Sequence, residues 1–145
     1  MKLSTKGKYG LRALIDLAQY SEDSPVSITS IARRQDISER YLEQLMSKLK
    51  KAGLVKSIRG ANGGYVLAKE AKDISVGDVL RALEGNLEPE GECKGADSCV
   101  TKYVWKRIND SINQTVDEIW LNQLVTESKC LGHTDNHLDY TKCKN

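Results

Sequence analysis

One stretch of the sequence, from Ser38 to Leu67 (SERYLEQLMSKLKKAGLVKSIRGANGGYVL), restricts the folds open to this chain more than any other. Its first part predicts a helix, because the hydroxyl of Ser38 can cap the first free backbone N–H groups and Gly53 follows as a stop signal. Four apolar residues recur at helical spacing and would form the buried stripe of this helix: Leu42, Leu45, Met46 and Leu49. The residues between them are polar and mostly basic, so we expect a positively charged exposed face.

Two short β-like runs follow this helix, at Leu54–Ile58 and Tyr65–Leu67, and the loop RGANGG joins them. The Asn-Gly-Gly sequence predicts a hairpin turn with Arg59 at its shoulder. A basic helix followed directly by a glycine-rich hairpin that carries an arginine indicates the reading head of a winged helix-turn-helix DNA-binding domain. The glycines leave out side chains that would hold the backbone away from DNA phosphates. The alternative, packed helices of a small bundle, does not account for the hairpin.

The rest of the N-terminal half fits the same domain. A first helix is expected from about Thr5 to Tyr20, and Ser27 can cap a short second helix, which the turn RQDIS separates from the basic helix. Two helices joined by a tight turn form the helix-turn-helix layout. After the hairpin, Ser75 and Asp78 resemble a capping box, which predicts another helix that ends at Gly85.

The charge of the chain is unevenly distributed. The net charge is +2, but residues 1–74 carry 14 Lys+Arg against 8 Asp+Glu, whereas residues 75–145 carry 8 against 12. A positive first half indicates that this half meets a polyanion. No apolar run approaches the ~18 residues of a transmembrane helix, and the N-terminus lacks an apolar signal-peptide core. We therefore expect a cytoplasmic protein whose four cysteines are reduced thiols or metal ligands.

A second long helix is expected from Thr101 to Leu124, a stretch without Pro or Gly. Its apolar residues fall at alternating three- and four-residue steps, as in a coiled-coil seam: Trp105, Ile108, Ile112, Thr115 and Ile119, broadened by Val104, Val116 and Trp120. A helix of ~20 residues extends ~30 Å, more than the winged domain alone would cover. Pairing with the same helix of a second subunit would bury it, and the alternative is an ordinary C-terminal core helix.

Between these helices lies an acidic loop, NLEPEGECKGADSCV, which contains Cys93 and Cys99. Two thiolates on a glycine-containing loop can hold a metal ion or an iron–sulfur cluster, although such a pair can also be idle. The last residues of the chain add further ligand types for zinc or a cluster: Cys130, His133, His137 and Cys143. Cys130 or Cys143 could complete a site with the two loop cysteines.

Four ordered motifs carry a family resemblance: KLSTKGKYGLRALIDLA, ERYLEQLMSKLKKAGLV, SIRGANGGYVL and ISVGDVLRALEG. Together they resemble a bacterial family of winged-helix repressors that includes the iron–sulfur regulator IscR, the nitric-oxide sensor NsrR and the cysteine-metabolism repressor CymR. The resemblance extends to about Leu124. It implies a homodimer that binds a roughly twofold-symmetric operator in double-stranded DNA, with one recognition helix and one wing per half-site.

The resemblance also implies which residues face DNA bases or phosphates: Ser38, Arg40, Tyr41, Glu43, Gln44 and Lys48 on the helix, and Arg59, Gly60, Asn62, Gly63 and Gly64 on the wing. Among them Glu43 is informative, because a carboxylate can accept a hydrogen bond from cytosine N4 in the major groove. Its alternative role is that of a solvated helix charge.

For the cofactor, the resemblance is incomplete. CKGADSCVTKYVW resembles the last two cluster cysteines of the iron–sulfur members, which places Cys93 and Cys99 as ligands, but Leu87 stands near their third cysteine and Lys102 near their histidine. A cluster would need a ligand from elsewhere, such as a glutamate, the partner subunit or a tail cysteine. The alternative is a cofactor-free repressor of the CymR type, which the wing and LEGNLEP also resemble. A partner protein such as a cysteine-synthesis enzyme, or thiol oxidation, would then control it.

We therefore predict a mainly α fold with a small β-hairpin wing: a winged helix-turn-helix domain over 1–85, a cysteine-containing loop over 86–100, a dimerisation helix over 101–125 and a tail over 126–145. The predicted function is DNA-binding regulation, as a repressor, of iron–sulfur or cysteine metabolism genes. No Ser/His/Asp arrangement or phosphate-cradling loop indicates an enzyme. A redox or metal-carrying adaptor that does not bind DNA is a further alternative, against which the basic helix and wing argue.

Overall fold

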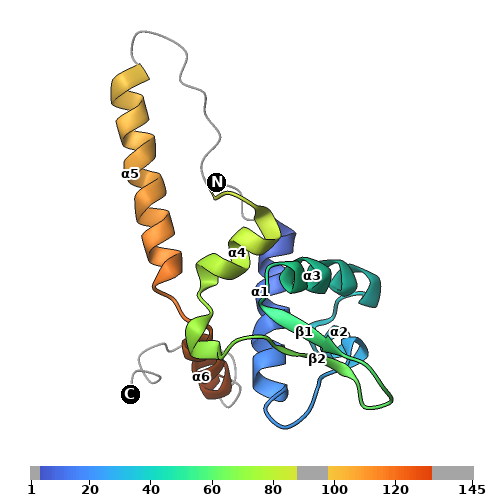
Figure 1. The fold of residues 1–145 in the computed structure, drawn as a ribbon. Coiled ribbons are helices and arrows are strands. Elements are labelled where there is room, and N and C mark those ends of the chain that lie inside the picture. Colours follow the sequence, from blue (N-terminus) through green and yellow to red (C-terminus); the bar gives the residue numbers. More distant parts are fainter. Residues whose placement is uncertain (1–3, 88–97, 132–145) are drawn as a thin grey trace.

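The computed structural model describes residues 4–87 and 98–131, apart from the side chains of residues 98, 99 and 131. In chain order its elements are α1 (Thr5–Tyr20), α2 (Ile28–Gln35), α3 (Glu39–Lys51), β1 (Val55–Ile58), β2 (Gly64–Leu67), the 3-10 helix η1 (Ala71–Asp73), α4 (Val76–Glu84), α5 (Ser98–Asp117) and α6 (Leu121–Leu131). Helices α1 to α4 and the hairpin form one body, and α5 projects from it (Figure 1). The predicted fold, mainly helical with a hairpin wing, is confirmed.

Serine caps begin the helices where the sequence predicts them. The side chains of Ser27 and Ser38 each accept a hydrogen bond from the backbone N–H three residues later, at 3.1 and 3.2 Å. At α4, Ser75 and Asp78 exchange both bonds of a capping box, at 3.0 and 3.1 Å. Each cap satisfies donors that the first helical turn leaves free, which stabilises a helix by about 1 kcal/mol. The predicted starts of α2, α3 and α4 are confirmed.

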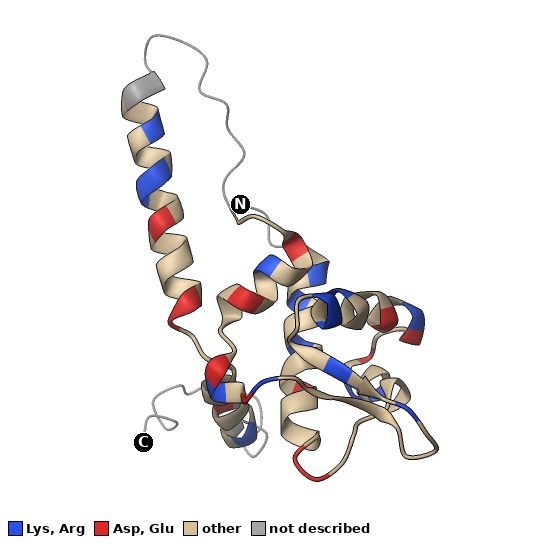
Figure 2. Cartoon of the chain, viewed as in Figure 1, with Lys and Arg blue, Asp and Glu red and all other residues tan. Residues whose placement is uncertain are grey.

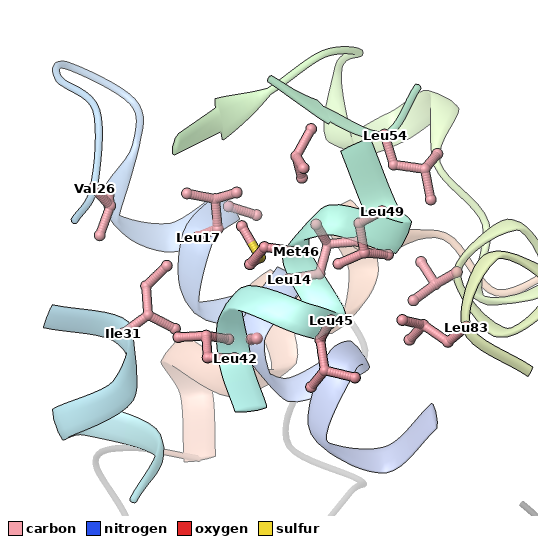
Figure 3. Close-up of a cluster of buried hydrophobic side chains, with 14 of the residues drawn as sticks. Leu14, Leu17, Val26, Ile31, Leu42, Leu45, Met46, Leu49, Leu54 and Leu83 are labelled. Carbon is pink, nitrogen blue, oxygen red and sulfur yellow. The ribbon is translucent and has the colours of Figure 1, made fainter. Parts of the chain in front are cut away.

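The core lies between α1 and α3 and is aliphatic. The two helices contribute side chains with almost no exposed surface: Leu14, Leu17, Leu42, Leu45, Met46 and Leu49. Figure 3 shows them packed together with Ile31 of α2 and Leu83 of α4. Burial of each such side chain contributes roughly 1.5–3 kcal/mol. The predicted buried stripe of α3 is confirmed, so the other face of this helix must point outward.

An ion pair fixes α2 against α1. The buried carboxylate of Asp16 accepts two hydrogen bonds from Arg34, at 2.8 and 2.7 Å, and one from the amide of Gln35 at 2.8 Å. The hydrogen bond to Asp16 raises the pKa of Arg34 above its ordinary value. The chain then turns at Asp36, whose φ of 53° is left-handed, a conformation that Asp tolerates better than most residues. This turn separates the two helices of the helix-turn-helix.

The wing is a two-stranded antiparallel hairpin that is attached to the start of α2. β1 and β2 pair from Val55↔Leu67 to Ile58↔Gly64. Val26 adds a bridge to Tyr65, with N–O distances of 2.9 and 2.8 Å. A Cβ atom at Gly64 would lie 2.4 Å from the carbonyl oxygen of Val26, so glycine is required here by the strand contact. No local sequence pattern indicates this role of Gly64.

The single helix predicted over 101–125 is wrong, because the structure has two helices in this part of the chain. α5 ends at Asp117 and α6 begins at Leu121, so the predicted seam residue Ile119 lies between them. The helix is interrupted by an antiparallel β-bridge between Trp120 and Ser75, which lies just before α4. The N–H of Val76 donates to the carbonyl of Ile119 at 2.8 Å, and the N–H of Leu121 donates to the carbonyl of Ile74 at 2.8 Å. These two bonds replace helical hydrogen bonds, and Leu121 becomes fully buried.

The boundaries of the loop and the tail shift accordingly. α5 begins at Ser98, inside the predicted loop of 86–100, and α6 runs to Leu131, inside the predicted tail of 126–145. α6 packs against α1 and η1, so this part of the chain belongs to the body. The remaining predicted ligands lie outside the described residues: Cys93, His133, His137 and Cys143.

Candidate nucleic-acid interface

The outward face of α3 carries most of the helix residues predicted to contact DNA. Arg40, Glu43, Gln44 and Lys48 are all exposed. Residues four positions apart share one face of a helix, so positions 40, 44 and 48 form a row with Glu43 beside it. Ser38 is exposed as well, but its hydroxyl already caps α3. The face thus offers two cationic groups, an amide and one carboxylate acceptor, the groups with which proteins read base edges.

Tyr41 lies at the edge of the core instead. It is half-buried, and its ring meets the ring of Tyr9 in α1 edge-to-face, with centroids 6.1 Å apart and planes at 85°. The guanidinium of Arg12 lies 5.3 Å from the centroid of the same Tyr9 ring. The ring of Tyr41 therefore joins α3 to α1, and a DNA contact through its hydroxyl stays a prediction.

The wing lies directly beside α3. The Nζ atom of Lys50 donates to the Oγ atom of Ser57 in β1 at 2.8 Å, which links the end of the helix to the hairpin. Arg59 and Asn62 are exposed at the end of the hairpin. The structure therefore brings the predicted helix residues and the predicted wing residues onto neighbouring surfaces.

The wing turn is formed one residue earlier than the Asn-Gly-Gly pattern predicts. The N–H of Gly63 donates to the carbonyl of Gly60 at 3.0 Å, which closes a β-turn over Gly60–Gly63. Gly60 has a φ of 125°, which favours glycine. An added Cβ there would meet no other atom within 4 Å. The backbone at this position is therefore open to a ligand.

Basic residues also gather on the side of α3 away from the wing. Figure 2 shows Lys and Arg where α3 meets the neighbouring ends of α1 and α4. Lys6 and Lys51 line one open hollow there together with Lys48. Lys6 and Lys51 were not among the residues predicted to contact DNA. The three-residue step from Lys48 to Lys51 could have indicated a shared face, but no local signal relates Lys6 to α3.

The described residues do not supply a complete metal or cluster site. Within 4–87 and 98–131, no group of three or more Cys, His, Asp or Glu side chains could hold a metal ion. Leu87, near the expected position of a third cysteine, is 5% exposed and packs with Val76 and Leu80. The backbone of Cys99 lies in the first turn of α5, and Cys130 lies in the last turn of α6. The ligand roles of Cys93 and Cys99 stay predictions, because residue 93 and the side chain of residue 99 lie outside the part of the chain that the structure describes.

With this geometry in place, comparison with known proteins identifies the family. Residues 3–127 match the Rrf2 family, described as iron-dependent transcriptional regulators. The chain belongs to the Rrf2 family. It is 41% identical over 140 residues to IscR of Vibrio atlanticus, which covers 93% of this chain and 81% of the relative. It is 40% identical over 136 residues to IscR of Escherichia coli O1:K1, with 90% and 84% coverage.

Solved structures of transcriptional regulators are also similar to this chain. CymR, the global cysteine regulator of B. subtilis, matches with a TM-score of 0.78 and 45% identity, over 86% of this chain and 96% of that one. IscR of T. potens matches with a TM-score of 0.76 and 46% identity, over 97% of both chains. The predicted family and the winged-helix fold are confirmed. This Rrf2 chain is a DNA-binding transcriptional regulator, and such regulators are not enzymes. None of its described helices is long and apolar enough to cross a membrane.

Proposed function

We propose that this Rrf2 regulator is a homodimer that represses genes of iron–sulfur or cysteine metabolism in the cytoplasm. One observation carries the DNA-binding mode: the wing, which carries the exposed Arg59, is linked to α3 by the hydrogen bond from Lys50 to Ser57. α3 enters the major groove, where Arg40, Gln44 and Glu43 meet base edges. Arg59 reaches the flank of the same half-site, and the open backbone at Gly60 approaches the phosphates.

The proposed dimer rests on the apolar surface of α5. Five large apolar residues of this helix are between 40% and 72% exposed: Val100, Tyr103, Val104, Trp105 and Ile108. A projecting helix with this much uncovered apolar surface needs a partner, since large exposed apolar patches on a soluble protein mark interaction sites. Two copies of α5 that pack together bury it. In this dimer each subunit presents one α3 helix to one half-site of a twofold-symmetric operator.

We propose that the regulator senses its signal through Cys93 and Cys99. Two sensing mechanisms are open, one with an iron–sulfur cluster and one without a cofactor. The names of the IscR relatives and the description of the Rrf2 family support an iron–sulfur cluster held by these thiolates with further ligands. The cofactor-free mode takes thiol oxidation or a partner such as a cysteine-synthesis enzyme as the signal. It is supported by Leu87, a buried apolar residue near the place where the iron–sulfur members have a third cysteine. It is also supported by the likeness to CymR of B. subtilis.

Selection of duplexes from a random-sequence pool tests DNA binding. The wild-type protein is expected to enrich a twofold-symmetric sequence and to protect both half-sites in a footprint. A Glu43→Gln variant should change which bases are preferred if Glu43 accepts from cytosine. Failure of the wild-type protein to enrich any sequence would refute the proposal.

Anaerobic purification separates the two sensing modes. The full-length protein is isolated without oxygen, its visible spectrum is recorded, and iron and acid-labile sulfide are measured. Absorption with stoichiometric iron and sulfide, lost in Cys93→Ser, supports the cluster. A colourless, iron-free protein that binds the selected duplex tightly rejects the cluster and favours thiol or partner control.

A further inference from the structure

We propose that the hollow on the side of α3 away from the wing binds a DNA backbone phosphate, with Lys6, Lys48 and Lys51 as its cationic groups. The hollow has a volume of about 490 Å³ and lies where the N-terminus of α1 meets the C-terminal ends of α3 and α4. This inference rests on the proposed function, because it needs a DNA duplex on α3. It adds a second phosphate-binding surface to the helix and wing residues that the family resemblance implies.

The three ammonium groups are available for an anion. Within the described residues, no ion pair or side-chain hydrogen bond engages Lys6, Lys48 or Lys51. Other lysines differ: Lys50 donates to Ser57, and Lys72 pairs with Glu70 at 3.0 Å. Three cations that line one hollow without counter-charges of their own repel one another, and a bound phosphate relieves that repulsion.

The remaining charged groups of the hollow are already occupied. Arg81 donates to Asp117 at 2.7 and 3.0 Å, so its charge is compensated. Glu84 carries the negative charge in the lining, and its Oε1 atom accepts from the N–H of Gly7 at 2.8 Å and from the hydroxyl of Ser4. These bonds tie the start of α1 to α4 and keep Lys6 beside α3. Glu84 is thus a positioning residue, and its charge weakens a phosphate contact.

The shape of DNA explains why a second surface is needed. An α-helix with its side chains is about 10–12 Å wide and fills a major groove about 12 Å wide, so phosphates lie along both of its flanks. The wing is linked to one flank of α3 through Lys50 and Ser57. The hollow occupies the other flank, and Lys48 borders both the hollow and the outward face of α3. A duplex read by that face therefore brings its second strand to the hollow.

The test compares charge variants of the full-length protein on the duplex that the wild-type protein selects. Lys6→Ala combined with Lys51→Ala is expected to lower affinity about tenfold near 0.15 M salt and to reduce the slope of log K against log[salt] by about two per dimer. Lys72→Ala, on η1 away from α3, is the matched control and should leave both quantities unchanged. A double variant that behaves like the control would overturn the proposal, provided circular dichroism shows it folded.

A second variant is expected to raise the affinity for DNA. Glu84→Gln keeps an oxygen that can accept from Gly7 but removes the negative charge, so affinity should rise several-fold. Glu70→Gln, at the start of η1, controls for the change in net charge. Equal effects of the two substitutions would count against the phosphate site. Failure of the proposed function looks different: the wild-type protein then selects no duplex, whereas failure of this inference leaves wild-type binding and its dependence on Arg59 intact.

Discussion

Arg81 in α4 donates two hydrogen bonds to the carboxylate of Asp117 at the end of α5, at 2.7 and 3.0 Å, and a third to the side chain of Asn113 at 2.7 Å. α4 and α5 approach closely here, since a Cβ atom on Gly77 would lie 2.0 Å from the carboxylate of Asp117. The contact sets the direction in which α5 leaves the body. In the proposed dimer, it therefore fixes the distance between the two α3 helices.

Asp117→Asn tests this contact through its pH dependence. The hydrogen bond from Arg81 holds the pKa of Asp117 below its ordinary value of 3.8. A carboxylate whose pKa is lowered by folding stabilises the protein above its unfolded pKa, and this contribution disappears as the pH falls through the folded pKa. Because both side chains are more than a third exposed, we expect a loss of at most about 1 kcal/mol at neutral pH.

Urea unfolding of the wild-type and Asp117→Asn proteins at several pH values provides the measurement. The difference in free energy of unfolding should be constant above about pH 5 and should vanish below the folded pKa. Asp110→Asn, whose carboxylate pairs with Lys106 on the exposed surface of α5, is the control for a solvent-facing pair. A difference for Asp117→Asn that persists unchanged at acid pH would contradict the role of the ion pair.

Arg59→Ala should weaken DNA binding without affecting stability, because its side chain is exposed at the wing. If Arg59 reads a base, affinity for the selected duplex falls by about 1–3 kcal/mol and the preference at one position relaxes. If it holds a phosphate, affinity falls uniformly and the salt slope decreases by about one per site. Fluorescence anisotropy on matched and mutated duplexes separates the two. Unchanged binding would remove the wing from the mechanism.

Ile108→Glu should dissociate the proposed dimer. Ile108 is 40% exposed on a helix with four other exposed large apolar residues, so a carboxylate at this position would be desolvated on pairing. We expect the dissociation constant measured by analytical ultracentrifugation to rise at least tenfold and operator affinity to fall with it. Lys106→Ala lies about half a turn away on α5 and serves as the control. A dimer as tight as that of the wild-type protein would place the subunit interface elsewhere.

Gly64→Ala should destabilise the wing. The added methyl group would lie 2.4 Å from the carbonyl oxygen of Val26, so the Val26–Tyr65 bridge must open or β2 must shift. Overpacking of this kind costs about 1–3 kcal/mol, measurable as a lower urea midpoint. Ala61→Ser, at the exposed tip of the hairpin, should leave the midpoint in place. If Gly64→Ala were equally neutral, the strand contact would not explain the glycine.

Most of the winged domain could be predicted from the sequence because its signals are local. Ser38 caps α3 within one turn, the apolar stripe from Leu42 to Leu49 repeats every three or four residues, and Ser75 meets Asp78 three residues later. Each interaction forms between close neighbours along the chain, so the pattern carries its own geometry. The exposed face of α3 that is predicted to contact DNA follows directly, since it is the side left over when the stripe is buried.

Other features depend on residues far apart. The sequence from Thr101 to Leu124 has no helix breaker, yet the helix ends at Asp117, because residues 74–76 supply backbone hydrogen bonds to the stretch around Trp120. Leu87 lies in a stretch whose composition predicts a loop, but its side chain is buried against Val76 and Leu80. Contacts between residues this far apart cannot be predicted from the periodicity of a short stretch of sequence.

The sequence by itself therefore determined the helix starts, the buried stripe of α3 and the hairpin, since these rest on contacts within a few residues, and its ordered motifs indicated the family. Only the tertiary structure decided where the helix predicted over 101–125 breaks, why Gly64 must be glycine, and that Lys6 lines the same hollow as Lys48 and Lys51. The physical reason is that these features need backbone bridges and helix packing between segments dozens of residues apart. The reading head is encoded locally, whereas the direction of α5 and the second flank of α3 are set by the packing of α1, α4 and α6 around it.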